Sequence, residues 1–210
     1  MVEFSARQKD VLTEVVNLGM GRAAASLSRL TGDRILLEVP RVEILPLAQL
    51  DDHLGEVADQ EVCSVLQVFE GEVAGDAILF LPLPSARNLL ELLVGRPMAL
   101  TRFSELEQAA LMEVGNIVIN ACLGSLANLL KTRFSFLVPH VAVQSLRPML
   151  RGDGRRDDPN RICLLVESRF RVKSRAVDGY LAIVVGVASA RALASAVDRL
   201  LTATVGSWTP

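Results

Sequence analysis

The chain carries the same pattern of residues twice. In each copy a glutamate is followed three positions later by an asparagine, and a proline follows after 22 more residues. The two copies are Glu14, Asn17 and Pro40, and Glu113, Asn116 and Pro139. A repeated spacing of this length in a chain of 210 residues indicates a duplication. We therefore expect two matching halves, at about 5–97 and 104–205.

Each glutamate and asparagine lies in a long pattern typical of an amphipathic helix. A helix turns about 100° per residue, which places Glu14 and Asn17 roughly 60° apart and Asp10 roughly 40° from Glu14. Apolar residues cover the opposite side of both helices: Leu12, Val15, Val16 and Met20, and Leu111, Val114, Ile117 and Val118. The pattern predicts that an acid-amide pair faces outward on each helix.

The first half reads as a long helix, three strands and a second helix. Ser5 and Gln8 have the spacing of a capping box, and the helix is expected to end near Leu30, before Thr31-Gly32-Asp33. The expected elements that follow are strands at Ile35–Ile44, Val62–Phe69 and Val73–Phe80 and a helix at Ser85–Leu93. Pro40 suits a strand that bends or lies at an edge. Residues 51–60 read as a loop or a short helical turn.

The second half repeats this order. Ser104 and Glu107 predict the start of a helix that runs to about Leu130. The expected strands are Phe136–Gln144, Ile162–Val172 and Ala176–Val185, and the last helix is Ser189–Thr202. A net insertion of five residues is assigned to a solvated loop at Leu150–Asn160. The predicted fold class is α+β, a tandem pseudo-twofold repeat in which an antiparallel sheet packs against helices.

Composition excludes several classes of protein. Lys plus Arg (22) nearly balances Asp plus Glu (24), so the chain lacks the broad positive field that supplies nonspecific affinity for nucleic acid. Its longest strongly apolar runs are shorter than the roughly 20 residues that span a bilayer, and the polar N-terminus does not resemble a signal peptide. We expect a cytoplasmic protein without membrane insertion.

The residues best known for nucleophilic or metal chemistry are sparse and scattered. Cys63, Cys122 and Cys163 have no metal-ligand spacing, and their odd number argues against a disulfide framework. They are expected to be buried packing residues. His53 and His140 have no neighbouring ligands in the sequence. The chain is predicted to bind no metal.

The duplicated pair can still support one kind of chemistry. An asparagine amide can donate from its nitrogen and accept at its oxygen, so it can orient a water molecule. Phosphoryl transfer depends mainly on such positioning, and an amide side chain serves this purpose in small GTPases. An isolated Glu-x-x-Asn would be an ordinary solvated helix face, but two copies with one spacing are hard to obtain by accident.

At these residues the chain resembles the CheC, CheX and FliY phosphatases, and most closely CheC. The shared pattern is an acidic residue or serine, a glutamate four positions later, an asparagine three positions after that, and a proline after 22 more residues. The resemblance covers essentially the whole chain, which it implies is a single CheC-like domain over 1–210. Ala109 departs from the pattern, because it stands where Asp10 stands in the first copy. The implied activity is that of a chemotaxis enzyme of two-component signal transduction, a hydrolase acting on the aspartyl-phosphate of the response regulator CheY.

The resemblance also implies how each residue acts. The response regulator would supply the phospho-aspartate, Mg²⁺ and a lysine, so this chain would bind no cofactor. Asn17 or Asn116 would align the attacking water, and Glu14 or Glu113 would pair with the lysine. Asp10 would support binding of the substrate protein at the first site. The two halves would form a monomer.

Two alternatives remain open. The chain could be a non-catalytic adaptor that binds CheD or a response regulator. It could also be a flagellar switch component of the FliY type, although such a protein would carry an extra C-terminal domain that this sequence does not include. The small residues from Gly21 to Ser28 favour close helix packing over a docking surface.

Overall fold

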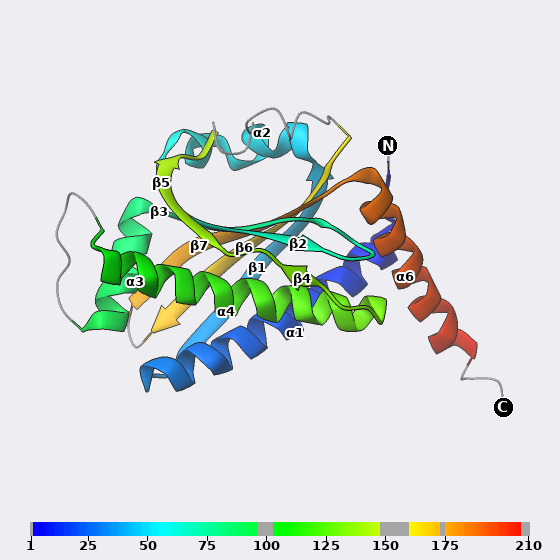
Figure 1. The fold of residues 1–210 in the computed structure, drawn as a ribbon. Helices are drawn as coiled ribbons and strands as arrows, with labels where there is room; N and C mark the ends of the chain where they lie inside the picture. The colour runs from blue at the N-terminus through cyan, green and yellow to red at the C-terminus, as the bar shows by residue number, and fades with distance from the viewer. Residues whose placement is uncertain (1, 96–102, 148–159, 173–174, 207–210) are drawn as a thin grey trace.

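The computed structural model describes residues 2–95, 103–147, 160–172 and 175–206 (Figure 1). The helices are α1 (Ala6–Thr31), α2 (Leu50–Leu54), α3 (Leu83–Val94), α4 (Glu105–Leu130) and α6 (Val187–Gly206). The strands are β1 (Ile35–Pro46), β2 (Glu61–Glu70), β3 (Gly75–Pro82), β4 (Ser135–Phe136), β5 (His140–Ser145), β6 (Ile162–Val172) and β7 (Arg175–Val185). Two 3₁₀ turns, Leu47–Gln49 and Gly55–Asp59, flank α2.

Both long helices begin at the capping boxes predicted from the sequence. The Ser5 hydroxyl accepts from the Gln8 backbone N–H at 3.3 Å, and the Gln8 side-chain oxygen accepts from the Ser5 N–H at 2.8 Å. Ser104 and Glu107 repeat this exchange at 3.4 and 2.8 Å. Gly32 ends α1 in the left-handed conformation, with φ 73°. The local start and stop signals therefore set where these helices lie in the chain.

The strands of the two halves interleave in one antiparallel sheet. Its order is β1-β6-β7-β3-β2, and β4 and β5 both pair with β2. The first strand of each half therefore pairs with the second strand of the other. At the centre, Ile78 of β3 is opposite Ala182 of β7, which stands 104 residues later. Ser85-Ala86-Arg87 and Ser189-Ala190-Arg191 have the same offset, so a pseudo-twofold axis passes through this central pair.

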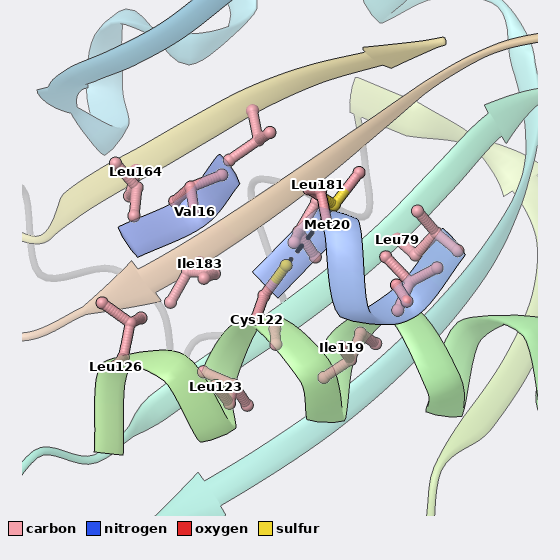
Figure 2. Packing of buried hydrophobic residues seen from close by; sticks show 14 of the residues in the cluster. Val16, Met20, Leu79, Ile119, Cys122, Leu123, Leu126, Leu164, Leu181 and Ile183 are labelled. Carbon is pink, nitrogen blue, oxygen red and sulfur yellow. Dashed lines mark hydrogen bonds between the residues drawn. The ribbon is translucent and has the colours of Figure 1, made fainter. Parts of the chain in front are cut away.

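Helices cover both faces of the sheet, but unequally. The larger core lies between the sheet and α1, α3, α4 and α6, and the smaller core lies under α2 on the other face (Figure 1). Figure 2 shows Met20 of α1 and Cys122 of α4 packed with Leu181 and Ile183 of β7 in the larger core. These contacts confirm the predicted fold class, an antiparallel sheet packed against helices.

One detail of the prediction changes, one of two alternatives is chosen, and one expected loop lies almost wholly outside the described residues. The strand expected at Phe136–Gln144 is two strands, β4 and β5, because Pro139 lies between them and has no N–H to donate to the sheet. Residues 51–60 are mainly helical, in α2 and the following 3₁₀ turn. Of the loop expected at Leu150–Asn160, only its last residue falls within the described part of the chain.

Pro40 lies where the strand prediction placed it. The pairing of β1 with β6 shifts register between Glu38 and Arg41, on either side of this proline. β1 is also the terminal strand of the sheet. An edge position and a register shift are the places where a strand tolerates proline.

The helix α4 is long and apolar enough to cross a membrane on length and composition alone. It has 26 residues, and its most apolar window has a mean hydropathy of 1.5. Half of that window is buried within the protein, where α4 packs against α1 and the sheet. This burial is typical of the core helix of a soluble protein, and the length test is weak evidence for a membrane span.

Candidate functional site

The first motif lies on the outer face of α1. Asp10, Glu14 and Asn17 are all exposed, one helical turn apart, whereas Leu12 and Val16 on the other side are at most 1% exposed. The apolar side of the helix is fixed in the larger core, so its rotation about its own axis is fixed as well. The amphipathic pattern correctly predicts which side of α1 faces outward.

The polar side chains of this first face have no partner within the described part of the chain. Neither a hydrogen bond nor an ion pair joins Asp10, Glu14 or Asn17 to the side chain of another described residue. Gly21 follows Asn17 by one turn, and a Cβ added there would meet no atom within 4 Å. Asn17 therefore has open space beside it and both polar ends of its amide available.

The second motif lies on α4 and differs at the asparagine. Glu113 and Ala109 are exposed, as their counterparts on α1 are, but Asn116 is only half-exposed. The Asn120 side-chain nitrogen donates a hydrogen bond of 2.6 Å to the Asn116 side-chain oxygen. The second pair therefore lies on the outer side of its helix, with an asparagine that is less exposed than Asn17.

The sequence places Asn120 opposite Gly21 as a difference in bulk between the two helices, but its hydrogen bond to Asn116 was not predicted. It occupies the position on α4 that Gly21 occupies on α1, one turn after the motif asparagine. Side chains four residues apart on a helix are neighbours, and amide pairs at this spacing form hydrogen bonds. The signal was therefore present in the sequence, as an asparagine four positions after another.

The two motif helices pack directly on one another. A Cβ added at Gly19 would lie 2.8 Å from the Cys122 Cα, so the α1 backbone approaches α4 at this point. Next to it, the Met20 and Cys122 sulfur atoms are 3.4 Å apart (Figure 2). The Arg22 guanidinium also donates to the Ser125 hydroxyl at 3.2 Å. Within the stretch from Gly21 to Ser28 that was predicted to serve helix packing, Ala23 is buried in the core, whereas Gly21 has open space around it.

The described residues offer little support for nucleophilic or metal chemistry. Burial raises the pKa of Cys63, Cys122 and Cys163 to about 12, so these thiols stay protonated at neutral pH. Their burial confirms the prediction that they are packing residues. Within the described ranges, no group of three His, Cys, Asp or Glu residues could hold a metal ion.

What remains on α1 is a carboxylate pair beside a free amide. Asp10 and Glu14 place negative charge on one exposed surface, which favours approach of a cationic group. Asn17, one turn further on, can hold a water molecule through its oxygen or nitrogen. The arrangement is suited to docking on a partner with a positive group and positioning water next to it.

Comparison with known proteins finds relatives at the level of sequence. A model of the CheC-like family matches residues 8–44, a segment that contains the first motif with its proline. The chain is also 32% identical over 139 residues to a Bacillus subtilis protein named CheY-P phosphatase CheC. That alignment covers 65% of this chain and 66% of the Bacillus protein, just under two thirds of its length.

Solved structures show the same fold at lower identity. Thermotoga maritima FliY matches with a TM-score of 0.75 at 20% identity, over 95% of this chain and 99% of that structure. The FliM middle domain from Helicobacter pylori matches with a TM-score of 0.65 at 13% identity, over 91% and 99%. At these identities the likeness extends to the fold alone.

Proposed function

The chain belongs to the CheC-like family, and we propose that it is a chemotaxis phosphatase that hydrolyses the aspartyl-phosphate of a CheY-like response regulator. The observation that carries the proposal is the exposed face of α1, where the side chains of Asp10, Glu14 and Asn17 are all exposed and bond to no side chain of another described residue. This face lies inside the segment that the family model matches. The name of the Bacillus relative, a CheY-P phosphatase, agrees with the proposed substrate.

In the proposed reaction the regulator carries the reacting phosphoryl group and the Mg²⁺ that neutralises its charge. Asn17 accepts a hydrogen bond from a water molecule, which turns the lone pair of the water toward phosphorus. The new bond forms between the water oxygen and phosphorus, and the bond to the aspartate oxygen breaks. The products are inorganic phosphate and the free aspartate. Asn17 supplies position and takes no part in a covalent bond.

The carboxylates bind the partner in this proposal. Glu14 pairs with the lysine of the regulator and fixes α1 against the phosphorylated site. Asp10, one turn earlier, adds negative potential toward the same cation. Glu113 and Asn116 are assigned the same roles on α4, without a counterpart of Asp10. No cofactor is assigned to the chain itself, and a monomeric, cytoplasmic protein remains our prediction.

A second candidate function is a non-catalytic adaptor that binds CheD or a response regulator. The observation that favours it is the shared fold of the FliM middle domain, which shows that this architecture extends beyond proteins named as phosphatases. Binding alone would leave the lifetime of the phosphorylated regulator unchanged. Phosphatase activity would shorten it.

The test is phosphate release from phosphorylated CheY-like regulators at saturating concentrations of this protein. We expect faster release with the wild type, and on the order of 10² less acceleration when Asn17 and Asn116 are both replaced by alanine, the scale for losing a positioning contact. Binding of the phosphorylated regulator should survive in the double variant. Asn88→Ala, an exposed asparagine on α3, is the matched control. An unchanged lifetime with wild-type protein, together with tight binding, would favour the adaptor.

A further inference from the structure

The two motif asparagines differ in what stands one helical turn after them. On α1 this position is Gly21, which has no side chain and open space around it. On α4 it is Asn120, whose side-chain nitrogen donates to the Asn116 oxygen at 2.6 Å. Asn17 is exposed and Asn116 is half-buried. The hydrogen bond from Asn120 therefore occupies the side-chain oxygen of Asn116, the atom that is proposed to hold water.

The Asn120 side chain is partly buried. Its side-chain oxygen is buried without a hydrogen-bond partner among the described residues, so one end of the amide points into the protein and the other toward Asn116. If both amides were turned over, nitrogen and oxygen would exchange places and the two side chains would still bond to each other. The contact between the two amides therefore survives if both are turned over together, and it is lost if only one is turned.

This contact competes with the proposed chemistry at Asn116. A water molecule that attacks phosphorus in line must direct its lone pair at the phosphorus, so its O–H groups need acceptors elsewhere. The amide oxygen is that acceptor, and on α4 it already accepts from Asn120. Asn116 must share this oxygen or leave the hydrogen bond before it can hold the water as Asn17 does.

We propose that Asn120 restrains Asn116 and thereby weakens the second site, and that Gly21 leaves the first site unrestrained. The inference rests on the proposed phosphatase function and names the residue that sets the relative strength of its two sites. Asn120 acts through Asn116 and is a positioning residue. Both motifs thus contain the same glutamate and asparagine, and only the asparagine of the second motif is restrained.

The test exchanges the two residues. In an Asn17→Ala background, where turnover comes from α4, Asn120→Ala should raise phosphate release about three- to tenfold, the range that one net hydrogen bond supports. In an Asn116→Ala background, Gly21→Asn should lower release from α1 by a similar factor. Asn120→Leu keeps the volume of the side chain without a donor, so it should raise release as Asn120→Ala does.

A second readout uses the unphosphorylated protein alone. In the NMR spectrum the side-chain amide of Asn116 should be ordered in the wild type and should become mobile, with shifted resonances, in both Asn120 variants. The side-chain amide of Asn17 should become more ordered in the Gly21→Asn variant. Because this experiment requires no regulator, its result does not depend on whether the chain is a phosphatase.

The outcomes separate the two proposals. If release is the same with wild type and with the Asn17→Ala, Asn116→Ala double variant, the phosphatase proposal fails, and the NMR result alone decides whether Asn120 restrains Asn116. If the double variant is inactive and Asn120→Ala leaves release unchanged or lowers it, the restraint is overturned. A rise with Asn120→Ala but not with Asn120→Leu would also overturn it, because bulk would then explain the effect. Circular dichroism of each variant verifies that it is folded.

Discussion

The exposed face of α1 and the exposed face of α4 carry the same glutamate-asparagine pair in different surroundings. On α1 the pair has an extra carboxylate before it and a glycine after it, and its asparagine is exposed. On α4 the corresponding neighbours are Ala109 and Asn120. Asn116 is half-buried, and its side-chain oxygen accepts a hydrogen bond from Asn120. Two copies of one motif therefore differ in the exposure of the asparagine and in the residues one turn before and after the pair.

The largest expected effect concerns how the two helices are held. A Cβ added at Gly115 would lie 2.5 Å from the Val65 Cβ on β2, and one added at Gly19 would meet the α4 backbone. Alanine at either position should lower the free energy of unfolding by about 1–3 kcal/mol, the usual cost of overpacking. Gly21→Ala and Gly124→Ala, where nothing lies within 4 Å, should instead raise it by about 0.5–1 kcal/mol. Chemical denaturation of the four variants measures this, and an equal effect at all four would rule out close approach as the reason for Gly19 and Gly115.

The second prediction compares the two asparagines directly. Asn17→Ala should leave about a tenth of the wild-type phosphate release, whereas Asn116→Ala should leave most of it. The reason is that the α4 site loses about 1 kcal/mol to the Asn120 contact and up to ~1 kcal/mol for the missing carboxylate. Steady-state release at subsaturating phosphorylated regulator is the measurement, because the contribution of the carboxylate is to binding. Activity carried mainly by Asn116 would show that these neighbours do not decide which site works.

The third prediction concerns binding. Glu14→Gln should weaken the complex with the phosphorylated regulator about fivefold, because it removes one charge of an exposed ion pair and retains the amide that orients water. Turnover at saturating protein should change little. Glu113→Gln should have a smaller effect on affinity. Titration calorimetry at low and moderate salt is suitable, because the loss should shrink as salt screens the pair. Unchanged affinity at low salt would contradict the anchoring role of Glu14.

The smallest expected effect is a gain. Ala109→Asp, made in the Asn17→Ala background, places on α4 the carboxylate that Asp10 supplies on α1. We expect phosphate release at subsaturating protein to rise about two- to threefold, since an exposed charge contributes ~1 kcal/mol or less. Ala109→Asn is the matched control, with similar volume and no charge. An equal rise with both substitutions would assign the effect to volume.

The sequence predicts the features that depend on neighbouring residues. The capping boxes at Ser5 and Ser104, the outward faces of both helices and most strand positions follow from short-range patterns. The break between β4 and β5 could also have been expected, because Pro139 stood inside the apolar run. The interleaving of the two halves could not have been predicted in this way. The strands are similarly apolar, so their composition does not indicate that β1 pairs with β6. Which strands pair is a property of the whole sheet.

The same distinction holds for the site. The spacing of Glu14 and Asn17 on a helix predicts that they share an exposed face, because the rotation of α1 is fixed by its own apolar residues. The state of Asn116 depends on more than spacing. Asn120 could have pointed into solvent, and its burial depends on how closely the surrounding protein packs around it. Sequence therefore predicts the pair on both helices and misses the contact that distinguishes them.

The interleaved sheet also has a consequence for the order in which the protein can form during synthesis. β1 ends at residue 46, but its partner β6 begins at residue 162, and β3 must wait for β7. Translation adds roughly 5–20 residues per second, so for seconds the first half exists with β1 unpaired and with β2 and β3 paired only to each other. Such edges are templates for pairing with another chain. We therefore expect the nascent first half to be the stage at which this protein is most exposed to aggregation.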